Sequence, residues 1–178
     1  MRPLLFNDCI LPKLNAMPEA QNVQVSYFID FPDHHWTEAD LQADWDATLP
    51  QLESRYPFPG GLAFVDEWGK KLVVEDQVDY LLFQFVKLTL EDLERQGWSS
   101  IPYLTENRNF QVLLMEEIAV IQLETGEELR IPYAAMKSAL IACAHRFREL
   151  LQRLPDRHPE RSHDIQWLGE LLEKFNAE

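Results

Sequence analysis

The chain has 178 residues, of which 46% are hydrophobic and 26% charged, values typical of one globular domain that buries its own core. Sixteen basic residues against 30 acidic ones give a net charge of −14 at pH 7. Such a charge repels nucleic-acid phosphates and anionic membranes, so we expect neither as a partner, and it attracts basic proteins.

The N-terminal third is predicted to begin irregularly and then form a strand. Residues 1–22 hold three prolines and no hydrophobic periodicity, which indicates an irregular lead-in. Apolar side chains then alternate with mostly polar ones over 23–31, as in a half-buried strand. No signal peptide and no membrane span is evident. The expected location is therefore the cytoplasm.

A helix and a hairpin are predicted next. Thr37 can cap a helix over 37–49, and acidic residues in its first turn suit the positive end of the helix dipole. Pro50 should kink or end this helix, because proline has no N–H to donate. Two apolar runs flank the turn at 66–70, which predicts a β-hairpin over 62–74.

Two long amphipathic helices and a three-stranded meander follow. The first helix is predicted over 76–96, with Gly97 as its left-handed stop. The meander spans 109–131, and Pro132 then starts the second long helix, which extends to residue 154.

The C-terminal end is predicted to be a polar connector over 155–164 and a short helix from Ile165. The element order lacks the regular alternation of a parallel α/β fold, which indicates the α+β class. The prediction is thus a single α+β domain over 1–178, with one antiparallel sheet of five or six strands packed by the two long helices.

The two cysteines are far apart in sequence, at Cys9 and Cys143. This excludes a disulfide framework and a zinc site of the CxxC type. Both are expected to be free thiols, with Cys143 buried on a helix. A single bridge between them stays open at this point.

Motifs that mark common catalytic sites are absent. The sequence contains no P-loop, no dinucleotide-binding fingerprint and no Gly-x-Ser-x-Gly elbow. We therefore expect a binding protein without a cofactor rather than an enzyme.

One group of side chains nevertheless has metal-binding chemistry. His34, His35 and Glu38 lie close together among further carboxylates, and imidazole and carboxylate groups bind divalent ions. The alternative function is then a metal-dependent enzyme. The interpretation we favour is a solvated loop followed by an acidic first turn, so no metal is expected.

The remaining signal is tryptophan beside acidic residues. Exposed tryptophan is enriched at the energetic centres of protein interfaces, and surrounding carboxylates would select a basic partner. The predicted partner-binding residues lie on the helix 37–49 and at the hairpin tip 66–70: Trp36, Glu38, Asp40, Asp44, Asp46, Asp66, Glu67 and Trp68.

The layout over residues 23–154 resembles that of the immunity proteins of bacterial polymorphic-toxin systems. The resemblance lies in a hairpin, Leu62–Val74, set before a long acidic amphipathic helix, Asp76–Gln96. The resemblance implies stoichiometric binding of a cognate toxin or effector. Acidic residues of this chain would then cover the basic active site of that toxin. An adaptor subunit of a larger assembly is a further alternative, and the sequence defines neither the partner nor the oligomeric state.

Overall fold

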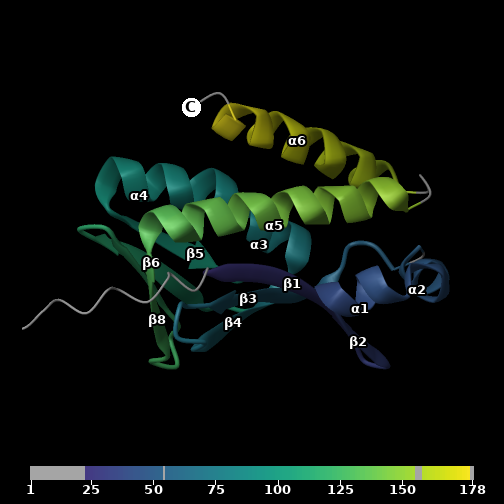
Figure 1. The fold of residues 1–178 in the computed structure, drawn as a ribbon, viewed down its shortest axis with the longest axis horizontal. Helices are drawn as coiled ribbons and strands as arrows, with labels where there is room; N and C mark the ends of the chain where they lie inside the picture. Colours follow the sequence, from purple (N-terminus) through teal and green to yellow (C-terminus); the bar gives the residue numbers. More distant parts are fainter. Residues whose placement is uncertain (1–22, 54, 155–157, 177–178) are drawn as a thin grey trace, which may run out of the picture.

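The computed structural model describes residues 23–53, 55–154 and 158–176, and its fold is α+β. Two antiparallel sheets of four strands each lie beneath a set of helices (Figure 1). The predicted irregular lead-in over 1–22, with Cys9, lies outside the described residues.

The first sheet has the strand order β2-β1-β3-β4. Its strands are β1 (Gln24–Phe31), β2 (His34–Thr37), β3 (Pro59–Val65) and β4 (Lys71–Gln77). The strand expected over 23–31 and the hairpin of β3 and β4 are confirmed. The sequence reading missed β2, whose four residues are too few to show an alternation.

The second sheet has the strands in chain order. They are β5 (Trp98–Pro102), β6 (Asn109–Met115), β7 (Ile118–Gln122) and β8 (Glu128–Pro132). The meander β6-β7-β8 is confirmed, and β5 adds a strand that was not predicted. The prediction of one sheet of five or six strands is wrong, because β2 and β5 were missed and the intervening helix separates two complete sheets.

Each helix expected in the first half of the chain is divided. The helix 37–49 is two helices, α1 (Glu38–Ala43) and α2 (Trp45–Leu52), which break at Asp44. Thr37 caps α1 as predicted, and Pro50 lies inside α2, which ends at Leu52.

The central helical segment combines α3 (Val78–Phe83), a π-helical stretch η1 (Gln84–Thr89) and α4 (Leu90–Gln96). Gly97 ends it with a φ of 79°, the left-handed conformation expected of a glycine stop. The ring of Phe85 in this segment packs at a tilt against Phe64 of the first sheet, with centroids 5.0 Å apart, and stacks on Phe110 of the second at 5.4 Å. The segment therefore packs against both sheets at once.

The last two helices are α5 (Tyr133–Arg153) and α6 (Pro159–Asn176). The predicted connector over 155–164 is too long, because α6 begins at Pro159, a residue suited to a first helical turn. Arg161 in that stretch is among the most buried side chains of the described residues. Cys143 lies buried on α5 as a free thiol, and burial raises the pKa of this thiol to about 12.

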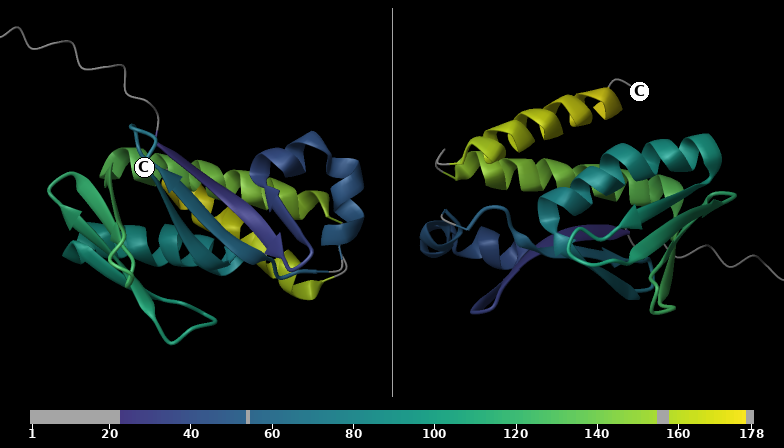
Figure 2. Two further views of the ribbon diagram at one scale, coloured as in Figure 1. Left: turned by 90° about the horizontal axis from the view of Figure 1, so that it is seen from below. Right: turned by 180° about the vertical axis from the view of Figure 1, so that it is seen from behind.

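The elements form three layers (Figures 1 and 2). The sheets form the lowest layer, the central segment and α5 the middle one, and α6 packs on the far side of α5. Viewed from below, the strands cross in front of the helices, so no helix of the described residues lies over the outer faces of the sheets (Figure 2, left). This arrangement decides which side chains are available to a partner.

A partly buried ion pair fastens the first sheet to the helices. Glu38 is 7% exposed and accepts hydrogen bonds from the guanidinium group of Arg146 on α5. Arg146 also donates to the backbone oxygen of Val25 at 2.8 Å. One guanidinium group thus joins α1, α5 and β1.

We expect Glu38→Ala to lower the free energy of unfolding by roughly 1–3 kcal/mol, since it leaves the Arg146 charge unpaired in a partly buried position. Asp46→Ala, which removes an exposed carboxylate from α2, should change it by less than about 0.5 kcal/mol. Urea unfolding followed by circular dichroism measures both values. Equal losses in the two variants would contradict the structural role of Glu38.

Asp79 in the first turn of α3 is a second partly buried acid. Its Oδ1 atom is enclosed by protein and accepts no hydrogen bond. Burial, and then the neighbouring Asp164 carboxylate, raise the pKa of Asp79 from 3.8 to about 6. Between these values the folded chain retains a proton that the unfolded chain has released. The free energy of unfolding therefore falls as the pH rises through this window.

Replacing the carboxyl group by an amide should remove this penalty. We expect Asp79→Asn to be more stable than the wild type at pH 8 by on the order of 1–2 kcal/mol, with the difference disappearing near pH 4. Urea unfolding at a series of pH values between 4 and 8 tests this. Parallel pH profiles for the two proteins would show that Asp79 does not bind its proton more tightly when folded.

Candidate binding surface

The outer face of the second sheet carries a cluster of apolar side chains. In a strand, alternate residues point to the same face, and the register places Trp98, Leu113, Val120 and Arg130 in one row across β5 to β8. The neighbouring row pairs Met115 with Ile118. We call this cluster the apolar patch, and it consists of Trp98, Leu113, Met115, Ile118 and Val120.

Three members of the apolar patch are strongly exposed. Trp98 is 50% exposed, Met115 58% and Ile118 38%. Exposed apolar residues that occur singly are ordinary, but a contiguous group on one sheet face is a mark of a binding surface. A tryptophan at such a position is the side chain most enriched at interface centres.

An acidic groove lies between β4 and the loops of the second sheet, away from the apolar patch. It has a volume of about 430 Å³. Four carboxylates and two cations line it, which leaves an excess of negative charge. We call it the glutamate groove, and its charged residues are Glu75, Glu106, Glu124, Glu127, Lys71 and Arg108.

Contacts within the glutamate groove leave most of its carboxylates facing solvent. Arg108 pairs with Glu106, which neutralises one of the four. Glu124 accepts a hydrogen bond from the backbone N–H of Asn109 at 2.9 Å, and Glu127 one from Thr125 at 3.2 Å. Neither contact cancels a charge, so the groove attracts cations.

The patch and the groove are parts of one surface. The row between them contains Ser100, Gln111 and Gln122, which pair in register on the outer face. A hollow of about 320 Å³ runs over Gln111 and Gln122 and reaches Glu124, which also lines the glutamate groove. The surface therefore offers apolar contact at one end and negative charge at the other.

The helical part of the predicted acidic surface is used largely by the fold. Trp36 is buried at 8% exposure, and Glu38 is held by Arg146. Asp40 completes a capping box with Thr37, whose N–H and hydroxyl both donate to its carboxylate, and these bonds lower the pKa of Asp40. Asp44 and Asp46 remain exposed.

One of the predicted partner-binding residues at the hairpin tip is also used by the fold. Asp66 is buried and its Oδ1 accepts the backbone N–H groups of Trp68 and Lys70, so it shapes the turn. Glu67 is half-buried, whereas Trp68 is 76% exposed. The Lys70 ammonium binds the backbone oxygen of Glu128 on β8, at the opposite side of the molecule from α1 and α2 (Figure 1). The two predicted acidic segments therefore do not form one surface.

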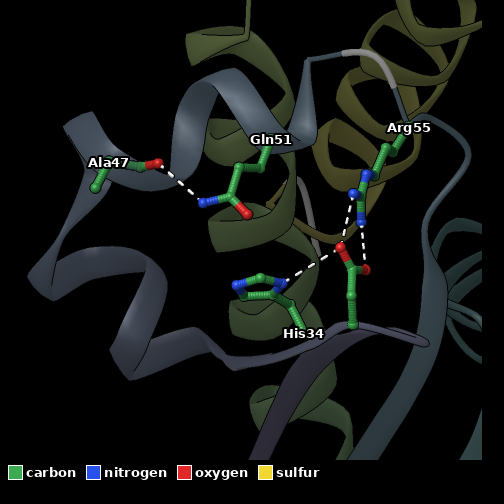
Figure 3. Close-up of polar contacts among 5 residues, drawn as sticks. His34, Ala47, Gln51 and Arg55 are labelled. Carbon is green, nitrogen blue, oxygen red and sulfur yellow. Dashed lines mark hydrogen bonds and ion pairs between the residues drawn. The ribbon is translucent and has the colours of Figure 1, made fainter.

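The three residues of the alternative metal site are not brought together. His34 and His35 are adjacent on β2, so their side chains point to opposite faces. His34 lies 3.5 Å from Asp33, which Arg55 also binds (Figure 3), and His35 lies 3.3 Å from Asp30. Glu38 is engaged by Arg146. Among the described residues, no three His, Cys, Asp or Glu side chains are grouped so that they could hold a metal ion.

Sequence reasoning missed the apolar patch. Strand β6 has three apolar residues on its core face, and Leu113 and Met115 on its outer face. An apolar run of this kind indicates that both faces of the strand are covered or bound. Trp98 follows directly after Gly97, in a segment for which the sequence predicted no strand. Only the pairing of β5 with β6 shows that Trp98 and Leu113 are neighbours.

Comparisons with known proteins do not supply a function. No family model matches the chain, and no match was found among the curated proteins or the solved structures. No helix in the described part of the chain is long and apolar enough to span a membrane.

Proposed function

We propose that the chain is a protein-binding domain that holds a basic protein partner on the outer face of its second sheet. The observation that carries this proposal is the adjacency of the apolar patch and the glutamate groove on one surface, which none of the described helices covers. Interfaces commonly combine a desolvated apolar centre with a charged rim, and the rim selects the partner by charge.

The net charge of −14 supports a basic partner, because a strongly negative field accelerates association with a positively charged surface. The form of this function that we propose is that of an immunity protein, which would bind and neutralise a basic toxin or effector. The layout resemblance supports this form, and the acidic groove supplies groups that could pair with a basic active site.

Two tryptophans offer a matched test of position. We expect Trp98→Ser to weaken partner binding by at least roughly tenfold, because it removes the centre of the apolar patch. Trp68→Ser makes the same change at a more exposed tryptophan on the hairpin tip and should have little effect. The partner is first isolated with the tagged wild-type chain from its native host at low salt, and the affinities of purified proteins are then measured by calorimetry.

The outcomes of this comparison are distinct. Loss of binding in Trp68→Ser alone would move the interface to the hairpin tip. Unchanged affinity in both variants would exclude the outer face of the second sheet. An isolated partner that is neutral or acidic would contradict the proposed charge selection and favour an adaptor role.

A second matched pair tests the charges. Glu75→Gln with Glu127→Gln removes two negative charges from the glutamate groove, whereas Asp44→Asn with Asp46→Asn removes one at the break between α1 and α2 and one from α2. We expect the first pair to weaken binding roughly three- to tenfold at low salt and to reduce its salt dependence. Affinities measured at two salt concentrations decide between the groups. A larger effect of the aspartate pair would assign the interface to the helices.

A further inference from the structure

A pocket of about 240 Å³ lies between α3 and α6, at the far end of the second sheet from Trp98. Tyr80 on α3 donates a hydrogen bond to the backbone oxygen of Pro102 at 2.7 Å, which places the pocket beside the end of β5. None of the residues that line it is lysine or arginine. They are Gln77, Asp79, Tyr80, Phe83, Leu104, His163, Asp164, Trp167 and Leu168.

Two carboxylates supply the negative charge of this pocket. Asp164 accepts a hydrogen bond from the hydroxyl of Tyr56, and its other oxygen lies 3.5 Å from the exposed His163. Asp79 has an enclosed oxygen without a hydrogen bond, and burial together with the charge of Asp164 raises the pKa of this acid to about 6. A cation in the pocket would relieve this unfavourable pairing of two carboxylates.

Aromatic side chains form a further part of the pocket wall, which we call the aromatic wall. Phe83 and Trp167 lie with their centroids 4.5 Å apart at an interplanar angle of 41°, and Tyr80 stands beside them. The faces of such rings attract cations. The ammonium group of Lys87 lies over the Phe83 ring, 4.9 Å from its centroid, so one face of this ring already holds a cation of the protein and a ligand would meet the other faces of the aromatic wall.

We propose that this pocket binds an organic cation, an ammonium or guanidinium group on a short aliphatic stem. The volume is below the roughly 300–1,000 Å³ of pockets for drug-sized ligands, so it suits a group of side-chain size. The cation would lie between the two carboxylates and the aromatic wall, with its stem against Leu104 and Leu168. Its source is either a free small molecule or an arginine or lysine side chain of a peptide.

This inference does not depend on the proposed function. The pocket shares no residue with the apolar patch or the glutamate groove. Loss of one binding activity would therefore leave the other to be tested.

The test is a titration of the full chain at pH 7.5 with n-butylguanidinium, followed by the NMR signal of the Trp167 indole N–H. We expect saturable shifts at millimolar concentrations, and none with n-butanol, which has the stem without the charge. Asp79→Asn should weaken binding by roughly tenfold, and Phe83→Leu should weaken it several-fold. Glu91→Gln is the matched control, because it removes one exposed carboxylate from the same helical segment, and it should bind as the wild type does.

A blocked Gly-Arg-Gly peptide distinguishes the two sources. Tighter binding of the peptide than of n-butylguanidinium indicates a side chain from another protein, and the reverse indicates a free small molecule. The proposal is overturned if neither probe shifts Trp167, if n-butanol binds equally well, or if Asp79→Asn and Phe83→Leu both bind as the wild type does.

Discussion

The central helical segment, residues 78–96, is the constraint on which the rest of the structure depends. Its buried residues recur at alternating steps of three and one, which gives one continuous apolar stripe along the whole segment. Phe85 contacts a ring from each sheet, and α5 packs against the same segment. The stripe is therefore buried between the two sheets and α5, and it joins them into one core. The helices of the described residues lie on the other side of the sheets and leave both outer faces uncovered (Figure 2).

The two outer faces have different compositions, and this difference locates the proposed interface. In the first sheet the ring of Phe28 lies over Gly61, so close that a Cβ added to Gly61 would be 2.7 Å from the ring. This aromatic side chain is therefore buried against its own sheet. The second sheet leaves Trp98, Met115 and Ile118 exposed. Exposed apolar area costs free energy that a partner can recover by covering it. We therefore place the proposed protein-binding function on the outer face of the second sheet.

Some of the carboxylates in this protein stabilise the fold, and others are available to a partner. Glu38 holds α5 to the first sheet, Asp40 caps α1 and Asp66 shapes the hairpin turn. Glu38 and Asp66 are buried and the Asp40 carboxylate is held in the capping box, so these three are poorly suited to recruit a basic partner. The carboxylates of the glutamate groove lie among fewer cations than anions, which is why we assign partner selection to them. Acidic composition alone does not distinguish the two uses.

The sequence by itself determined the α+β class, the strand over 23–31, the hairpin, the meander, the Thr37 cap and the Gly97 stop. These features depend on interactions between residues close in sequence, such as alternation, capping and left-handed glycine, so local patterns reveal them. Only the tertiary structure decided that there are two sheets, that α6 begins at Pro159, that Glu38 is paired with Arg146, and that Trp36 is buried while Trp98 is exposed. Each of these depends on a partner distant in sequence: Trp98 meets Leu113 only through strand pairing, and Glu38 meets Arg146 only when α5 crosses the first sheet.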